Sequence, residues 1–222
     1  MFMDRQFRIA RVWSNQELKK FSGLFGGDVV NVSAWDDRDK EGGCYKSYFS
    51  RASHYYYTNY GGTRGLQGCD DEFAVDLSGE VPADLQGRFD TAFNHTTLEH
   101  VFDARKAFSN ICRMSRDAVI VVVPFSQVQH ETDSYGDYWR FTPSCVRALF
   151  RENGLDVIYE AESTHRKAAV YLLFVGSRHA DRWRGKMPVW APIQTAGAWI
   201  GFRRSTKIYE MIKRRIFKSR HT

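Results

Sequence analysis

The segment at residues 118–123 constrains the fold of this chain more than any other feature of its sequence. Its letters, AVIVVV, are all apolar and mostly β-branched. A strand with apolar side chains on both faces is typical of the centre of a parallel sheet, where helices cover both sides. The apolar run ends at Phe125, far short of the roughly 20 apolar residues that span a bilayer. We therefore expect an α/β fold around this strand, which should end at Pro124 because proline cannot continue the ladder.

Short apolar runs alternate with helical stretches from about residue 28, which is the pattern of a parallel α/β sheet. Four strands are expected before the central one, at residues 28–33, 54–58, 72–76 and 89–93. Two more, at 155–161 and 168–175, are separated by a polar turn and should close the sheet as an antiparallel hairpin. Together these segments predict a doubly wound, mostly parallel, seven-stranded sheet.

Helices are expected between the strands. A short one is predicted at 44–50, and a second begins at Asp103, with its apolar positions at three- and four-residue spacing. A third should begin with Thr142 as N-cap and Pro143 as its first helical residue, and end before Gly154.

The chain has 222 residues, room for one ordinary domain and an appendage. We expect an N-terminal cap at 1–27, in which we find no chemistry, a main domain at 28–178, and a basic tail at 179–222. The net charge of +6 is uneven, because the segment from Asp181 onward holds eleven Lys and Arg against two acids, leaving −3 for the first 180 residues. A net acidic domain is a poor nucleic-acid binder, so no nucleic-acid partner is expected.

The cysteines and the N-terminus indicate where the protein works. Cys44, Cys69, Cys112 and Cys145 show no CxxC spacing, which disfavours a zinc knuckle or a disulfide scaffold and suits a reducing compartment. The N-terminal residues carry charges where a secretory signal would be apolar. A cytoplasmic protein is expected.

Doubly wound sheets bind ligands at the carboxyl ends of their strands, so the residues just past each predicted strand are the candidates for a site. The loop at 126–141, after the central strand, is rich in polar and aromatic residues, among them His130, Glu131, Asp133 and Asp137. A loop of this length in a compact domain usually acts as a lid or binding element.

Several motifs in a fixed order resemble one family. They are FD at 89–90, LEHV at 98–101, VVVPF at 121–125 and DYWRFTP at 137–143. This order and spacing is similar to that of class I S-adenosylmethionine-dependent methyltransferases, and more narrowly to the methyltransferase type 11 group. The resemblance covers roughly residues 28–178 and implies a Rossmann-like fold with S-adenosylmethionine as cofactor.

The resemblance also implies which residues meet the cofactor. The loop after the first strand (Asn31, Ser33, Ala34 and Trp35) would hold its methionine part, and Asn59 and Tyr60, after the second strand, would lie at the ribose. Asp76 would bind the adenine amino group with Leu77 against the ring, and Asn94 would line the methionine end.

Two positions depart from the family pattern. The first loop lacks the family's glycines, which let the backbone approach the cofactor closely, and Trp35 stands where bulk is least welcome. Asn59 replaces the family's ribose-binding carboxylate. Either the cofactor is held in a modified way, with Asp36, Asp37 or Asn59 substituting, or its binding is weak or lost.

His130 and His95 are the candidates for a general base, since an imidazole titrates near neutral pH. An exposed loop histidine is the alternative for His130. For Glu99 and His100, at the entrance to a helix, a structural role is expected, either capping or pairing with a neighbouring loop. Asp137 is expected to anchor its loop to Arg140 or to a helix N-terminus. Tyr138 and Trp139 are expected in the core, with a sugar-stacking surface as the alternative. No metal site is expected, because His130, Glu131 and Asp133 are too close in sequence to make a good ligand set.

Two functions remain open at this point. The first is methyl transfer to an oxygen or nitrogen of a small-molecule or glycan acceptor, in line with the polysaccharide pathways of some family members. The second is a binding or scaffold protein that kept the fold and lost the cofactor. The tail at 205–218 has an amphipathic basic pattern, which fits peripheral attachment to anionic lipid, packing on its own domain, or a homodimer.

Overall fold

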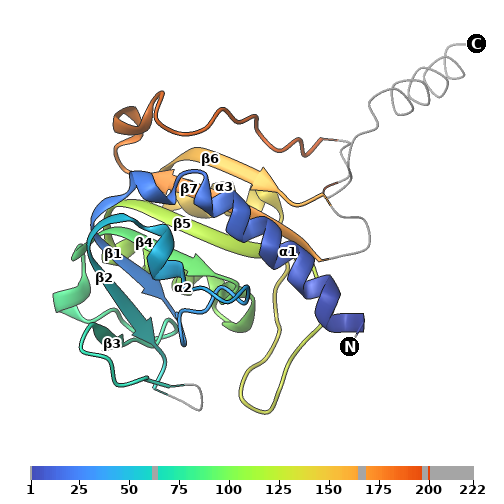
Figure 1. The fold of residues 1–222 in the computed structure, drawn as a ribbon, viewed down its shortest axis with the longest axis horizontal. Helices are drawn as coiled ribbons and strands as arrows, with labels where there is room; N and C mark the ends of the chain where they lie inside the picture. The colour runs from blue at the N-terminus through green and yellow to red at the C-terminus, as the bar shows by residue number, and fades with distance from the viewer. Residues whose placement is uncertain (1, 62–64, 165–168, 197–199, 201–222) are drawn as a thin grey trace, which may run out of the picture.

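The computed structural model describes residues 2–61, 65–164, 169–196 and 200, and side chains from residue 8 onward. Its centre is one seven-stranded sheet in the order β3-β2-β1-β4-β5-β7-β6 (Figure 1). The strands are β1 (Gly26–Val32), β2 (Arg51–Asn59), β3 (Glu72–Ala74), β4 (Phe89–His95), β5 (Ser115–Ser126), β6 (Asp156–Glu162) and β7 (Val170–Ser177). Strands β1 to β5 pair in parallel, whereas β7 is antiparallel to both β5 and β6. The predicted α/β sheet with a closing hairpin is confirmed.

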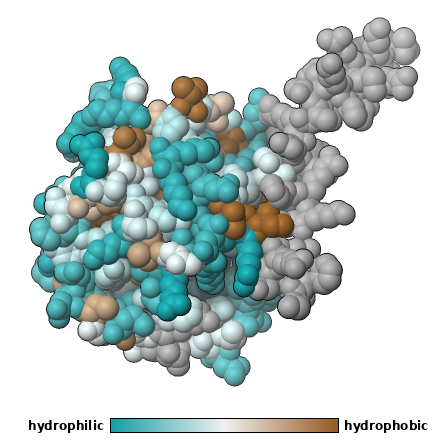
Figure 2. All heavy atoms as spheres, viewed as in Figure 1, coloured by the Kyte–Doolittle hydropathy of each residue, from teal (hydrophilic) through white to brown (hydrophobic). Residues whose placement is uncertain are grey.

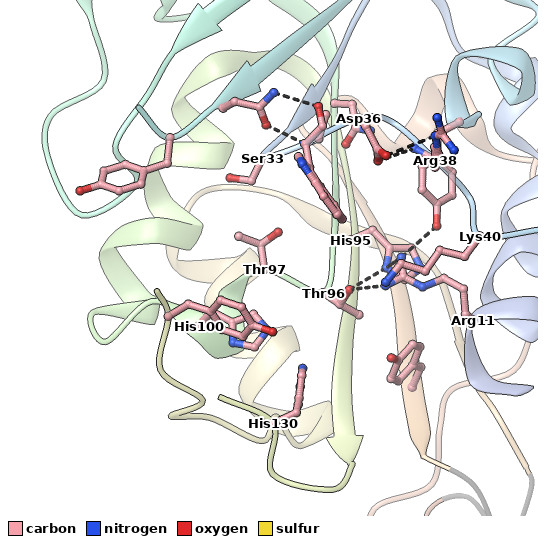
Figure 3. A pocket seen from close by; sticks show the side chains of 18 of the residues that line it. Arg11, Ser33, Asp36, Arg38, Lys40, His95, Thr96, Thr97, His100 and His130 are labelled. Carbon is pink, nitrogen blue, oxygen red and sulfur yellow. Dashed lines mark hydrogen bonds and ion pairs between the residues drawn. The ribbon is translucent and has the colours of Figure 1, made fainter. Parts of the chain in front are cut away.

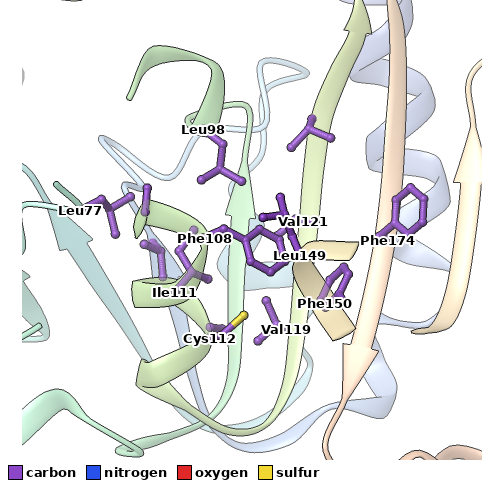
Figure 4. Packing of buried hydrophobic residues seen from close by; sticks show 14 of the residues in the cluster. Leu77, Leu98, Phe108, Ile111, Cys112, Val119, Val121, Leu149, Phe150 and Phe174 are labelled. Carbon is purple, nitrogen blue, oxygen red and sulfur yellow. The ribbon is translucent and has the colours of Figure 1, made fainter. Parts of the chain in front are cut away.

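Strand β5 joins two hydrophobic cores, one on each face of the sheet. Val119, Val121 and Val123 lie in the core formed with α2 (Ala104–Met114) and α3 (Pro143–Glu152), part of which Figure 4 shows. The alternate residues of β5, Ala118, Ile120 and Val122, lie in the core on the other face. All six side chains are essentially inaccessible to solvent. The apolar pattern of this segment is thus explained by burial on both sides.

Helix α1 (Phe2–Lys19) covers the second face, and its buried Ala10 and Leu18 belong to that core. It lies against β7 and crosses the sheet, with its first half at the carboxyl ends of the central strands, where Arg8 and Arg11 lie (Figure 1). This position brings residues from the start of the chain to the edge of the sheet where ligands bind in folds of this kind.

The predicted caps are confirmed. Asp103 accepts a hydrogen bond from the backbone of Lys106 at the start of α2. The Thr142 side chain accepts from the Cys145 backbone, with Pro143 as the first residue of α3. Gly154 follows α3 with φ +70°, a conformation that glycine adopts at little cost.

Two expectations about local structure were wrong. Strand β5 does not end at Pro124, because the ladder with β7 continues to Ser126 across a register shift. On the other side β4 has its last partner at Val122, and proline is tolerated at such an irregular margin of a sheet. The helix expected at 44–50 is a single 3₁₀ turn, η2 (Tyr45–Tyr48).

The predicted tail segment at 205–218 lies outside the described residues, so its lipid, intramolecular and dimer interpretations stay predictions. In the part of the chain that the structure describes, no helix has the length and apolar character needed to cross a membrane. Figure 2 shows mainly hydrophilic side chains on the viewed face, with hydrophobic ones in small separate groups.

Candidate functional site

A cavity of about 810 Å³ lies at the carboxyl edge of the central strands. Its walls come from the loops after β1, β2, β4 and β5 together with α1 (Figure 3). Eight of the eleven predicted site residues line it: Asn31, Ser33, Ala34, Trp35, Asn59, Tyr60, His95 and His130. The volume lies within the range of about 300–1,000 Å³ that is usual for small-molecule sites.

The loop after β1 adopts backbone conformations that glycine would favour, although it contains none at these positions. Ser33, Trp35 and Asp37 have φ values of +57°, +51° and +58°. Each such residue costs roughly 1–2 kcal/mol in an L-amino acid, and strain of this kind collects at functional sites. The loop therefore has the left-handed backbone of a glycine-containing loop, and other interactions must stabilise this conformation.

The hydrogen bonds that hold this loop come mainly from the end of β2. The Trp35 backbone donates to the Asn59 side-chain oxygen at 2.6 Å, and the Asn59 amide donates back to the Trp35 carbonyl at 3.0 Å. The Ser33 backbone donates to the Thr58 hydroxyl at 3.1 Å. The same Asn59 amide nitrogen donates to Glu72 at 2.6 Å. The polar atoms of Asn59 are thus engaged in shaping the loop.

Asp37 and Asp36 have different surroundings. Asp37 is buried and accepts hydrogen bonds from Asn31, the Tyr55 hydroxyl and the Lys46 backbone, at 2.7, 3.0 and 2.9 Å. Burial raises the pKa of Asp37 above its ordinary value. Asp36 is exposed on the cavity wall. Of the three substitutes considered for the missing ribose carboxylate, Asp36 is the one with its carboxylate at the cavity surface.

Three predicted cofactor residues do not line the cavity. Asp76 is exposed and accepts a hydrogen bond from the Ser78 backbone at 2.8 Å, while Leu77 is buried in the core with α2. Asn94 is buried and donates to the Val32 carbonyl at 2.8 Å, which ties β4 to β1. The cofactor contacts of Asp76, Leu77 and Asn94 stay predictions, and direct contact would require these side chains to reach the cavity.

His95 is enclosed by residues of α1. Its Nδ1 lies 2.9 Å from a guanidinium nitrogen of Arg11, and its Nε2 lies 2.8 Å from the Ser14 hydroxyl. Because arginine can only donate, Nδ1 must accept, and the proton of the neutral ring is on Nε2. Burial, with the charges of Arg11 and Lys40, holds the pKa of His95 well below its ordinary value. This arrangement leaves His95 a neutral positioning residue rather than a receiver of substrate protons.

The sequence did not predict Arg11, which lines the cavity, or Ser14, which contacts His95, since the N-terminal segment was expected to carry no chemistry. Arg11 also donates to the Tyr45 hydroxyl at 3.1 Å and to the Thr96 hydroxyl at 2.9 Å. No local motif marks them. Their place follows from the docking of α1 across the sheet, which sequence periodicity does not predict.

The loop at 127–142, between β5 and α3, forms another wall of the cavity. Asp137 forms an ion pair with Arg140 at 2.6 Å, which confirms its expected anchoring role. Asp137 also accepts from the backbone of His130 at 2.8 Å. Tyr138 and Trp139 are 51% and 42% exposed, so the expectation that they lie in the core was wrong. The Trp139 ring nitrogen donates to the carbonyls of Val101 and Phe102, which holds the indole at the surface.

Glu99, beside the cavity, has an unexpectedly buried carboxylate. It lies in the 3₁₀ turn η4 (Leu98–His100), where the sequence placed it, but its side chain is fully buried. Neither carboxylate oxygen has a hydrogen-bond partner among the described residues. Burial raises the pKa of Glu99 to about 8. A structural role was expected for Glu99, but within the described chain its carboxylate has only a 3.9 Å approach to Nε2 of His100 and no hydrogen bond.

Comparisons with known proteins agree with the architecture. No family model matches the chain. No curated protein matches it at a significant level. Among solved structures it is similar to the magnesium protoporphyrin IX methyltransferase of Synechocystis with bound S-adenosylhomocysteine (TM-score 0.58, 12% identity, 80% of this chain and 87% of that one).

Two further solved structures are similar. One is the 1,6-didemethyltoxoflavin-N1-methyltransferase of Burkholderia thailandensis, with bound 1,6-didemethyltoxoflavin and S-adenosylhomocysteine (TM-score 0.52, 15% identity, 75% and 80% coverage). The other is a putative methyltransferase of Bacillus halodurans (TM-score 0.53, 9% identity, 73% and 97% coverage). The chain has the class I S-adenosylmethionine-dependent methyltransferase fold that its motifs predicted.

Proposed function

We propose that this protein is an S-adenosylmethionine-dependent methyltransferase acting on a small-molecule or glycan acceptor in the cytoplasm. The observation that carries the proposal is the cavity at the carboxyl edge of β1, β4 and β5, bounded by a loop with left-handed backbone at Ser33 and Trp35. In doubly wound sheets this edge is the ligand-binding edge. Two of the similar solved structures hold S-adenosylhomocysteine, the product of this cofactor, which supports the same choice here.

The residues of the cavity fit such a cofactor. Ser33 and Ala34 would hold its methionine part, and Asn59 and Tyr60 lie beside the loop where its ribose would be placed. Trp35, with 43% of its surface exposed, is a wall of the cavity, and the hydrogen bonds of its backbone to Asn59 keep it there. Asn94 would act through the end of β1 rather than by direct contact.

The cofactor supplies an activated methyl group on a sulfonium. With the cofactor held by these residues, a lone pair of the acceptor oxygen or nitrogen would form the new bond to carbon. The electron pair of the broken carbon–sulfur bond would stay on the sulfur of S-adenosylhomocysteine, and the acceptor proton would pass to solvent water. This reaction depends chiefly on alignment of the reacting atoms. The cavity provides that alignment through rigid strand ends, and the network around Arg11 and His95 fixes one of its walls. A base role for His130 stays a prediction.

The charge of the cavity favours an acceptor with a negative group. Arg8, Arg11, Arg38 and Lys40 line it, and Asp36 is the acidic residue among its described lining. Outside the cavity lining, Tyr138 and Trp139 of the loop at 127–142 lie in contact with Phe102, with centroid distances of 5.4 and 6.4 Å. All three rings are exposed. Such a surface suits stacking on a sugar ring, which supports a glycan acceptor and a place in polysaccharide synthesis.

The second candidate is a scaffold protein that does not bind the cofactor. The engagement of Asn59 with Trp35 and Glu72 favours it, because the residue at the ribose position has no polar atom left over.

Calorimetric titration of the full-length chain with S-adenosylmethionine and S-adenosylhomocysteine separates the two. Saturable 1:1 binding of both ligands is expected for the enzyme. Absence of heat and of any thermal shift at millimolar ligand would contradict the enzyme and favour the scaffold.

A further inference from the structure

A cluster of possible metal ligands lies at the wall of the cavity, outside the part assigned to the cofactor. Glu99, His100 and His130 each offer one ligand atom, and these atoms all lie within 4.8 Å of one another. His100 and His130 line the cavity, and Figure 3 shows them on the same wall. The sequence did not predict this set, because His130 of the β5–α3 loop meets His100 of η4, which is 30 positions earlier in the chain.

The carboxylate of Glu99 provides independent support for a ligand at this point. It is fully buried, and neither of its oxygens accepts a hydrogen bond from any residue that the structure describes. Its Oε1 lies 3.9 Å from Nε2 of His100, which is too far for a hydrogen bond. A buried carboxylate of this kind is costly unless it is paired or coordinates a cation.

The two imidazoles are oriented as metal-binding imidazoles usually are. Nδ1 of His100 lies 2.7 Å from the Gly136 carbonyl, so it carries the proton and Nε2 presents a lone pair on the side of Glu99. Nδ1 of His130 lies 3.2 Å from the Val128 carbonyl and 3.3 Å from the Asp137 carboxylate. The Gln127 amide nitrogen lies 3.3 Å from each ring nitrogen of His130, a contact that a bound ion would displace. Histidine ligands typically donate their second nitrogen to a carbonyl or carboxylate, which fixes the tautomer and the ring.

We propose that Glu99, His100 and His130 bind one divalent transition-metal ion on the acceptor side of the cavity. Two imidazoles and one carboxylate favour Zn²⁺, Fe²⁺, Co²⁺ or Mn²⁺ over Mg²⁺, which prefers oxygen ligands. Ligands about 2.1 Å from a common ion lie about 3.0–3.5 Å apart, so the set contracts by about 1 Å on binding. His130 is on a long loop between β5 and α3, which can supply this movement.

Three protein ligands leave coordination positions toward the cavity. There the ion would hold an oxygen of the acceptor and favour loss of its proton, which is the task otherwise assigned to a general base. This catalytic role rests on the proposed methyltransferase function, whereas binding of the ion does not.

The test is a titration of EDTA-treated, full-length protein with Zn²⁺ and Co²⁺, with Mg²⁺ for comparison. We expect one tight equivalent of Zn²⁺ or Co²⁺, weaker binding of Mg²⁺, and visible absorption bands of bound Co²⁺. His130→Ala and His100→Ala should each weaken binding by at least tenfold, since loss of even an outer partner of a ligand costs about 10–100-fold. His54→Ala, which removes an exposed histidine of β2, is the matched control and should bind as the wild type does.

Equal affinity in wild type and His130→Ala, or the lack of a saturable 1:1 site, would overturn the proposal. Glu99→Gln is a third variant, and if it fails to fold, the loop variant His130→Ala still decides the question. Binding of S-adenosylmethionine to the EDTA-treated protein is measured separately. A cofactor site without a metal site would refute this inference alone, and a metal site without a cofactor site would refute the proposed methyltransferase alone.

Discussion

The guanidinium of Arg11 donates to Nδ1 of His95 across 2.9 Å, joining the N-terminal helix to the end of β4. Ser14, one turn further along α1, lies 2.8 Å from the other ring nitrogen. Both nitrogens of His95 are therefore satisfied by α1, and this helix forms part of the cavity wall as well as covering the sheet. The pair gives the first prediction.

Replacing Arg11 with Met should raise the pKa of His95. Burial still opposes protonation in this variant, but the nearby positive charge and the donor to Nδ1 are gone. The measurement is an NMR titration of the histidine ring nitrogens. Arg38→Met removes a cavity cation that is not among the causes of the low His95 pKa, and it should leave His95 unchanged. An equal shift in both variants would contradict the assignment.

His95 should also make stability depend on pH. Its pKa in the folded state lies below the unfolded value of about 6.5, so the unfolded chain takes up the proton first. This contribution is complete above about pH 6.5 and is lost as the pH falls below it. Urea unfolding at pH 7.5 and 5.5 should show a smaller loss for His95→Gln than for wild type. Parallel losses in the two proteins would refute this reading.

Asn59 should be needed for the shape of the first loop. Asn59→Ala removes three hydrogen bonds, and we expect a loss of about 1–3 kcal/mol in unfolding free energy and weaker cofactor binding. Asn59→Asp would restore the family's acidic residue but would place it against Glu72, now 2.6 Å from the amide. It should therefore be less stable than wild type without binding the cofactor more tightly. Tighter binding by Asn59→Asp would contradict this view of the loop.

Gly176 on β7 packs against the ring of Phe150 from α3. A Cβ at this position would lie 2.3 Å from a ring carbon that is fully buried. Gly176→Ala should lower the unfolding free energy by about 1–3 kcal/mol, because the helix must move away from the sheet. Gly61→Ala, where a Cβ meets no atom within 4 Å, is the matched control for thermal or urea unfolding. Equal stability of the two variants would contradict the packing.

The sheet could be predicted from the sequence because its signals are local. Residues 118–123 are apolar on both faces, and Thr142 with Pro143 marks a helix start without reference to the rest of the fold. The continuation of β5 past Pro124 depends on where the neighbouring β4 ends, which is not a property of the segment itself. The loop after β1 is a second example. Its lack of glycine predicts a poor fit to the cofactor, but its backbone conformation depends on hydrogen bonds to Thr58 and Asn59 of β2.

The site was predicted only in part. The strand-end rule found Asn31, Ser33, Trp35, Asn59 and His95 on the cavity wall. It could not find Arg11, which reaches the site through the docking of α1, or the approach of His130 to Glu99. These depend on contacts between segments far apart in the sequence.

The most direct test of the account is a crystal structure of the protein with S-adenosylhomocysteine. We predict that the ligand lies in the cavity with its amino-acid end at Ser33 and Ala34, that Trp35 flanks it, and that Arg11 still binds His95. A structure in which the Trp35 indole fills the cavity, with the ligand absent or bound elsewhere, would contradict the account.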